Sequence, residues 1–181
     1  MKKICTLLFM VLSVFALNAQ TVNYLFGGPG DANSEFAGGL NDWITVGVSS
    51  DVPDSAQNAV WVWTPDGRLN TGRFWGDAGT IFSPSVTNGA AGFNSDFLDN
   101  GGADFGTGAA PSPHRGELIS PMFDCTGVND VILKFNHSAR NFRSTFLVEV
   151  TNGSDSTIYN INDEIPVNKS QIDDVVVLDI S

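Results

Sequence analysis

The chain has 181 residues, with 9 basic and 20 acidic side chains and a net charge of −11 at pH 7. This acidic composition excludes a basic surface that could neutralise phosphates, so we expect neither nucleic-acid binding nor attraction to anionic membranes. The same acidity suits a soluble exported protein, and carboxylates are the oxygen ligands that calcium takes.

The N-terminus has the pattern of a signal peptide. Lys2 and Lys3 precede an apolar run over residues 4–16. This run is shorter than the roughly 20 residues that span a bilayer. We expect residues 1–19 to be removed, so that the mature protein is secreted or held at the cell surface without a membrane-inserted segment. Cys125 then has no cysteine to pair with, and a packing role is expected for it.

Residues 20–34 are predicted to be a lead-in, and residues 35–181 to form one β-rich domain. Short alternating runs bounded by Gly, Pro, Asn and Asp predict its strands. In the first half of the domain we expect strands at 34–36, 43–48, 60–63, 80–82 and 90–95. Gly47 marks a candidate bulge. The Gly-rich segment 99–116 is predicted to be a loop held by its ends or by an ion.

The clearest alternation of apolar and polar residues lies in the second half of the domain. It predicts strands at 131–136 and 146–150, then a type I′ turn at Asn152-Gly153 and a returning strand at 157–161. No run after the signal peptide has apolar residues at helical spacing. The fold class is therefore predicted to be all-β, an antiparallel two-sheet sandwich.

A set of short motifs is spread over residues 35–181. They are Glu35-Phe36, Gly38-Gly39-Leu40 with Trp43, the strand from Ala59 to Trp63, the run from Ala91 to Asp96, and Leu118-Ile119-Ser120-Pro121 with Phe123-Asp124 and Gly127, before a strand ending in Phe135 and His137. As a set they resemble the bacterial cleaved-adhesin or choice-of-anchor J domains, relatives in shape of the MAM domain. The resemblance implies a jelly-roll sandwich, export by the type IX secretion route, and further domains in the same polypeptide.

The last strand is predicted at 172–180, with Val176, Leu178 and Ile180 on one face. Because the sequence stops after it, we expect this strand to lack a partner. The domains that this chain resembles continue with two more strands. We therefore expect an incomplete sandwich that lacks its last strands and exposes an apolar edge.

The sequence offers little for catalysis. Its two histidines are His114, in a Pro-rich loop, and His137, on the core-facing side of a strand, where a buried and hydrogen-bonded structural role is expected. We find no H-E-x-x-H, G-x-S-x-G or Walker motif and no spaced set of Cys and His. We therefore expect a protein that is not an enzyme, although its many carboxylates leave a glycosidase pair open.

Calcium binding is the better-supported chemistry. Oxygen-bearing side chains cluster at Asp31, Asn33 and Glu35 and again at Asp96, Asp99, Asn100 and Asp104. The first cluster opens like an EF-hand loop, but Phe36 stands where that loop needs glycine. The resemblance implies instead a jelly-roll calcium (Ca2+) site, with Glu35, Asp96, Asp99 and Asp104 as candidate ligands. Ordinary turn roles for these residues are the alternative.

Aromatic side chains define the candidate ligand-binding surface. Trp61 and Trp63 share one face of a strand, while Phe74 and Trp75 lie in a Gly-rich loop. Stacking of sugars on these rings is one interpretation, and core packing is the other, above all for Trp61 and Trp63. Trp75 is the stronger candidate because its loop has few apolar neighbours.

These features predict a non-catalytic adhesion or carbohydrate-binding β-sandwich module of an exported protein. Its partner would be a glycan or a host or matrix surface protein. Two alternatives stay open. One is an accessory domain of a secreted peptidase or glycoside hydrolase whose catalytic part lies outside this chain, and the other is a structural module of the cell envelope.

Overall fold

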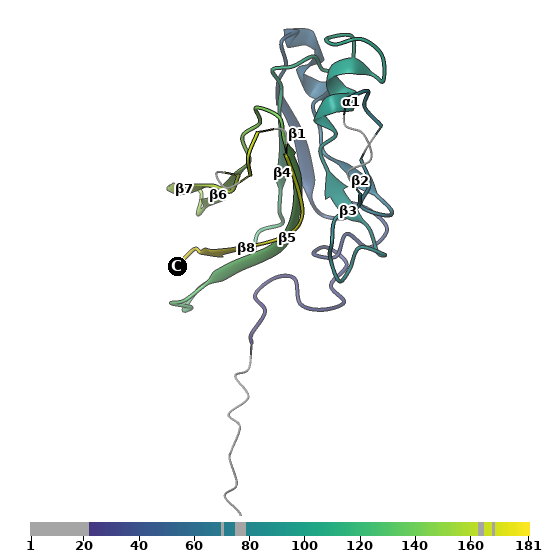
Figure 1. The fold of residues 1–181 in the computed structure, drawn as a ribbon. Coiled ribbons are helices and arrows are strands. Elements are labelled where there is room, and N and C mark those ends of the chain that lie inside the picture. Colours follow the sequence, from purple (N-terminus) through teal and green to yellow (C-terminus); the bar gives the residue numbers. More distant parts are fainter. Residues whose placement is uncertain (1–21, 70, 75–78, 163–164, 168) are drawn as a thin grey trace, which may run out of the picture.

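The computed structural model describes residues 22–69, 71–74, 79–162, 165–167 and 169–181. The elements in these ranges are β1 (Ile44–Ser49), the 3-10 helix η1 (Pro53–Asn58), β2 (Val62–Thr64), β3 (Ala90–Gly92), α1 (Ser95–Asn100), β4 (Arg115–Ile119), β5 (Ile132–Asn141), β6 (Leu147–Thr151), β7 (Ser156–Asn160) and β8 (Lys169–Asp179). The strands pair antiparallel as β1–β4, β2–β3, β5–β8 and β6–β7 (Figure 1). The predicted β-rich antiparallel fold is confirmed, while the predicted signal peptide, residues 1–19, lies outside the described residues.

Several predicted strands are placed differently. Residues 34–36 form turns, and residues 80–82 are not in a strand. The strand expected at 90–95 ends at Gly92, and the chain then enters α1. The sequence shows no helical spacing at α1, because a helix of six residues is too short to show apolar periodicity. Among the described residues, no helix is both long and apolar enough to cross a membrane.

The β1–β4 sheet places Gly47 opposite Gly116, and the chain bulges between Gly47 and Ser49, as expected. A Cβ atom on Gly47 would lie 2.1 Å from the carbonyl oxygen of Ala56. A Cβ atom on Gly116 would lie 2.2 Å from the carbonyl oxygen of Ala59. The backbone that follows β1 therefore crosses the sheet so closely that only glycine fits beneath it.

Trp61 directly precedes β2 and links the β2–β3 sheet to the face of the β1–β4 sheet that this backbone crosses. Its main-chain N donates a hydrogen bond to Oγ1 of Thr45 at 2.7 Å, and its indole N donates to the carbonyl of Gly116 at 3.2 Å. Its ring centroid lies 5.8 Å from that of Phe93, which follows β3. The strand predicted to begin at residue 60 therefore begins later, at Val62, because the preceding backbone bonds to β1 instead.

The buried apolar side chains in the described ranges are small or medium in size. They are Ala59, Ala90, Ala110, Ala139, Ile165 and Val176. Larger apolar side chains of β1 lie on its open face, where Ile44 is 60% exposed and Val46 is 38% exposed. The described fold therefore depends on close backbone packing and hydrogen bonding as well as on apolar burial.

β8 is paired with β5, so the prediction of a last strand without a partner is wrong. Phe135 lies opposite Val176 in this ladder, where facing side chains contact one another. The alternation predicted for β8 is confirmed, because Val176 is 8% exposed while Val175 and Val177 are 44% and 57% exposed. One face of β8 therefore contributes to the core, and the other is open.

The predicted β6–β7 hairpin is confirmed, but its turn is not type I′. Thr151 pairs with Ser156, so the loop contains the residues between them. Asn152 does not have the positive φ that a type I′ turn requires. Its Oδ1 instead accepts hydrogen bonds from the main-chain N of Ser154 at 2.9 Å and of Asp155 at 2.8 Å. The asparagine side chain, rather than a tight backbone turn, reverses the chain.

Replacing Gly116 with alanine is expected to lower the free energy of unfolding by about 1–3 kcal/mol, because the new methyl group would meet the backbone of Ala59 and the ring of Phe93. Urea unfolding followed by tryptophan fluorescence measures this change. Gly39→Ala is the matched control, since its Cβ atom would lie 3.7 Å from the nearest atom. An unchanged unfolding midpoint for Gly116→Ala would contradict the close backbone approach.

Candidate functional site

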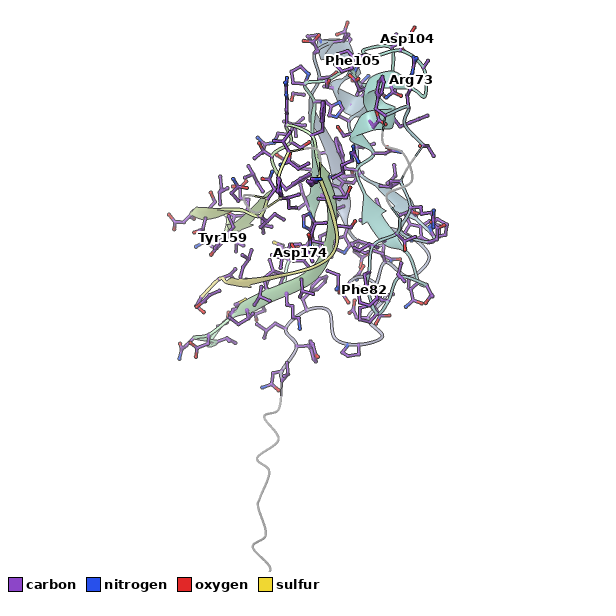
Figure 2. All side chains as sticks on the ribbon, viewed as in Figure 1. Arg73, Phe82, Asp104, Phe105, Tyr159 and Asp174 are labelled. Carbon is purple, nitrogen blue, oxygen red and sulfur yellow. The ribbon has the colours of Figure 1, made fainter. Side chains whose placement is uncertain are left out.

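The candidate site is built around α1 and the Gly-rich loop that follows it. Asn94 caps the start of the helix by accepting a hydrogen bond from the main-chain N of Phe97 at 3.3 Å. Gly101 ends the helix in the left-handed conformation, with φ of 61°. In Figure 2, Asp104 and Phe105 of this loop lie beside Arg73 at one end of the molecule.

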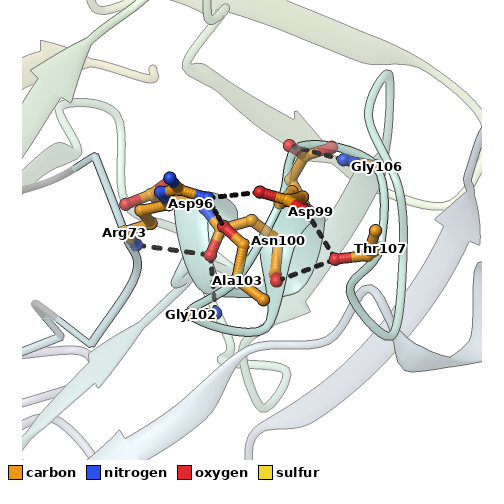
Figure 3. Close-up of polar contacts among 9 residues, drawn as sticks. Arg73, Asp96, Asp99, Asn100, Gly102, Ala103, Gly106 and Thr107 are labelled. Atoms are coloured by element: carbon orange, nitrogen blue, oxygen red, sulfur yellow. Dashed lines mark hydrogen bonds and ion pairs between the residues drawn. The ribbon is translucent and has the colours of Figure 1, made fainter.

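Two buried polar side chains of α1 hold the Gly-rich loop. Asp99, 5% exposed, accepts hydrogen bonds from the main-chain N of Ser112 at 2.8 Å and of Gly106 at 3.4 Å. Asn100 is fully buried and accepts from the main-chain N of Gly102 at 2.6 Å (Figure 3). These bonds order a loop that has few apolar side chains to bury.

Asp96 and Arg73 extend the same network (Figure 3). Asp96 accepts one hydrogen bond from the main-chain N of Phe74 at 2.8 Å and another from the side-chain amide of Asn100. Arg73 forms an ion pair with Asp104. That pair is open to solvent and contributes little to stability by itself, whereas Asp96 fixes the neighbouring segment against the helix.

The candidate calcium ligands belong to two different hydrogen-bonded groups. The three aspartates are part of the network around α1, whereas Glu35 accepts hydrogen bonds from the main-chain N of Gly30 and the side-chain amide of Asn88, both at 2.8 Å. Within the described ranges, no group of three or more His, Cys, Asp or Glu side chains is placed to hold a metal ion. Calcium binding by these residues stays a prediction.

Asp31 and Asn33 of the first acidic cluster shape local turns. Oδ1 of Asp31 accepts a hydrogen bond from the main-chain N of Ser34 at 2.9 Å. The side-chain amide of Asn33 donates to the carboxylate of Asp42 at 3.0 Å. These contacts fit the alternative interpretation of this cluster as turn residues.

A cleft of about 310 Å³ opens beside α1 and β2. Its lining is mostly apolar and includes Val62, Leu69 and Phe97, with Asn58, Thr71 and Asn94 as polar groups. Asn94 donates a hydrogen bond to Oγ1 of Thr71 at 2.7 Å, and the side-chain amide of Asn58 donates to the carbonyl of Ala109 at 2.8 Å, so each polar group is held in position. Phe97 is 42% exposed and supplies the aromatic part of the lining.

The predicted tryptophan platform is largely occupied by packing. Trp61 and Trp63 are half-buried, and the indole N of Trp63 donates to the carbonyl of Phe36 at 2.8 Å. Both indole N–H groups are therefore used within the fold. Trp75, the stronger candidate from the sequence, lies outside the described residues.

Phe97 of α1, Phe105 of the Gly-rich loop and Phe74 of the segment bonded to α1 are exposed aromatics at the site. Phe74 is 58% exposed, with the guanidinium carbon of Arg73 5.6 Å from its ring centroid. Phe97 was not predicted as a site residue, because the residues around it show no helical periodicity. The available signal was Asn94, a preferred helix-capping residue, followed by the acidic first-turn residue Asp96.

His137 lies in β5 with its side chain 14% exposed, between the rings of Phe135 and Phe146 at centroid distances of 6.5 and 5.7 Å. Its buried Nδ1 lies 3.5 Å from the carboxylate of Asp174 and has no hydrogen-bond partner among the described residues. Burial lowers the pKa of His137 below 6.5, and Asp174 opposes that shift. His137 is half-buried rather than buried, with its Nδ1 atom covered, and the predicted hydrogen bonding fails at that atom.

No protein-family model matches this chain, and no curated protein or solved structure matches it. The resemblance to the cleaved-adhesin or choice-of-anchor J domains therefore stays a prediction from the motifs. Function has to be argued from the geometry around α1.

Replacing Asn100 with alanine is expected to lower the free energy of unfolding by about 1–3 kcal/mol, because the part-buried main-chain N atoms of Gly102 and Arg73 lose the acceptor that the buried Asn100 side chain provides. Thermal unfolding followed by circular dichroism measures the loss. Asn129→Ala is the control, since Asn129 is exposed in the segment before β5.

The same melting experiment shows whether the Gly-rich loop after α1 is held by hydrogen bonds alone or also by a bound calcium ion. If a bound ion also holds the loop, a chelator should lower the melting temperature, and Asp96→Ala should abolish that difference while Asp54→Ala preserves it. Equal melting temperatures with and without chelator would refute the calcium site. An unchanged melting temperature for Asn100→Ala would refute the hydrogen-bonded loop.

The free energy of unfolding is expected to fall as the pH drops below 6.5, the ordinary pKa of histidine, and then through the lower pKa of His137 in the folded protein. In that window the unfolded chain binds a proton at this residue more readily than the folded chain, so stability is fully present above the unfolded pKa and declines as pH falls. Urea midpoints measured from about pH 8 to about pH 5 test this dependence. His137→Gln should flatten the decline, and an equal decline in that variant would assign the proton to another group.

Proposed function

We propose that this chain is an adhesion or carbohydrate-binding module of an exported protein that is secreted or displayed at the cell surface. In this proposal the small sheets are parts of a jelly-roll sandwich, and further domains belong to the same polypeptide. The observation that carries the proposal is the cleft beside α1, which falls in the size range of small-molecule sites.

The lining of the cleft suits the two-sided chemistry of a sugar. Phe97 and Leu69 offer apolar surface to the C–H face of a pyranose ring, and Asn58 and Thr71 offer polar groups to its hydroxyls. The hydroxyl of Thr71, which accepts from Asn94, keeps its own hydrogen to donate. A few fixed polar groups in an apolar cleft give orientation as well as affinity.

The net negative charge of the chain favours neutral glycans over anionic ones. With 20 acidic and 9 basic side chains, the protein repels sulfated, phosphorylated and uronic acid-rich chains at a distance. A neutral glycan, free or attached to a host or matrix surface protein, is the partner that fits.

Phe74 extends the binding surface beyond the cleft. Its main chain is fixed to α1 through Asp96, while its side chain is 58% exposed. Because the backbone of Phe74 is already fixed, only side-chain freedom is lost when its ring contacts a ligand. A glycan longer than one sugar would therefore contact Phe74 as well as Phe97.

A neutral-glycan array followed by titration calorimetry tests the proposal. Phe97→Ala is expected to weaken binding of the best neutral glycan about tenfold, because the apolar contact is lost. Phe82→Ala is the matched control, since Phe82 is 72% exposed and lies away from Arg73 and Asp104 in Figure 2. Binding of no neutral glycan, or equal affinity of Phe97→Ala and the unaltered protein, would contradict the assignment.

A further inference from the structure

Ser95 and His114 are 19 residues apart in the chain and are hydrogen-bonded in the structure. Oγ of Ser95 lies 2.8 Å from Nε2 of His114, and Nδ1 of His114 lies 2.7 Å from the carbonyl oxygen of Ala110. Ser95 is exposed as the first residue of α1, whereas His114 is half-buried at the end of the Gly-rich loop. The sequence shows neither the pairing nor the motif usually associated with it.

The hydrogen-bond partners define the direction of each bond. A carbonyl oxygen only accepts, so Nδ1 of His114 must carry the hydrogen that is donated to Ala110. In the neutral imidazole, Nε2 is then the acceptor, and the hydroxyl of Ser95 must donate to it. This is the arrangement of a nucleophile beside a general base whose tautomer is fixed by a third group.

The base is held in position by its surroundings. Ala110 is fully buried, and its main-chain N donates to the carbonyl of Leu98 at 2.8 Å, so the carbonyl that orients His114 is itself tied to α1. The ring of Phe93 meets the imidazole edge-on at a centroid distance of 5.4 Å. The main-chain N of Ser95 donates to the carbonyl of Phe93 at 3.1 Å, which fixes the nucleophile to the same support.

We propose that Ser95 is a nucleophile that accepts acyl groups from small carboxylic esters, with His114 as its general base. The bond from Oγ of Ser95 to the ester carbonyl carbon forms while the hydroxyl proton passes to Nε2 of His114. The alkoxide then leaves with that proton, which yields an acylated Ser95 and an alcohol. Water, deprotonated by His114, attacks the acyl carbon, releases the carboxylic acid and returns the proton to Oγ.

The substrate class follows from the cleft that shares α1 with this pair. Asn94, next to Ser95, and Phe97, two residues further on, line a mostly apolar cleft of about 310 Å³. A short acyl chain or the apolar face of an alcohol fits that space better than a charged group. This activity goes beyond the proposed glycan binding and does not depend on it.

Covalent labelling of the intact protein tests the proposal. Diisopropyl fluorophosphate is expected to add once, with the bond from Oγ of Ser95 to phosphorus replacing the bond from phosphorus to fluorine, and with the proton passing to His114. Peptide mapping should find the label on Ser95 at least about 100-fold faster than on Ser156, an exposed serine at the start of β7. Because both serines are in one molecule, this comparison needs no variant and no assumption about folding.

Two variants and an ester substrate distinguish a reactive Ser95–His114 pair from a hydrogen bond that only links α1 to its loop. Ser95→Ala and His114→Gln should both abolish the fast label and the release of p-nitrophenol from p-nitrophenyl acetate, while circular dichroism verifies that each variant is folded. Equal labelling of Ser95 and Ser156 in the unaltered protein would overturn the proposal. That result would leave the hydrogen bond as a link between α1 and its loop, and it would leave glycan binding by the cleft unaffected.

Discussion

Backbone contact across the paired glycines Gly47 and Gly116 determines where the half of the molecule that carries the candidate site lies. Because neither residue has a side chain, the carbonyl oxygens of Ala56 and Ala59 occupy positions that Cβ atoms would fill. The backbone that makes this contact leads directly to Trp61, whose indole bonds back to the carbonyl of Gly116. The location of β2, β3 and therefore α1 depends on this crossing, since each follows from the one before it in the chain or in the sheet.

Because the buried apolar side chains of this fold are small, its structure depends more on hydrogen bonds, which are directional. Asn141 donates to the carbonyl of Ile165 at 2.7 Å, and Asn162 donates to that of Ser144 at 2.8 Å, much as Asn100 serves the loop after α1. An apolar contact tolerates sliding, but a hydrogen bond weakens steeply when its length or angle changes. Buried asparagines therefore specify loop positions more narrowly than apolar burial would, and the cost of leaving one unpaired is high.

Alternation could predict β5, β6 and β8 because each strand has one covered face, but it could not predict their partners. β8 was expected to be unpaired, yet it lies along β5, and choosing that partner requires long-range geometry. α1 escaped prediction since six residues carry no periodicity. The candidate residues Asp96 and Asp99 were identified from composition, but both accept hydrogen bonds from main-chain N–H groups, which are the same in every sequence. The sequence could therefore predict which side chains carry useful chemistry, but not which main-chain groups they would bond to.

A helix of six residues would not be stable alone, yet it positions the whole candidate site. Asp99 binds the main-chain N of Ser112, and Leu98 accepts from the main-chain N of Ala110, so the loop that carries His114 is fixed to the same helix that carries Ser95. Phe97 lines the cleft from that helix as well. Because nucleophile, base and cleft are all tied to α1, a displacement of this element moves them together and preserves their mutual geometry. This explains how a site on surface loops can be held accurately enough for binding or for chemistry.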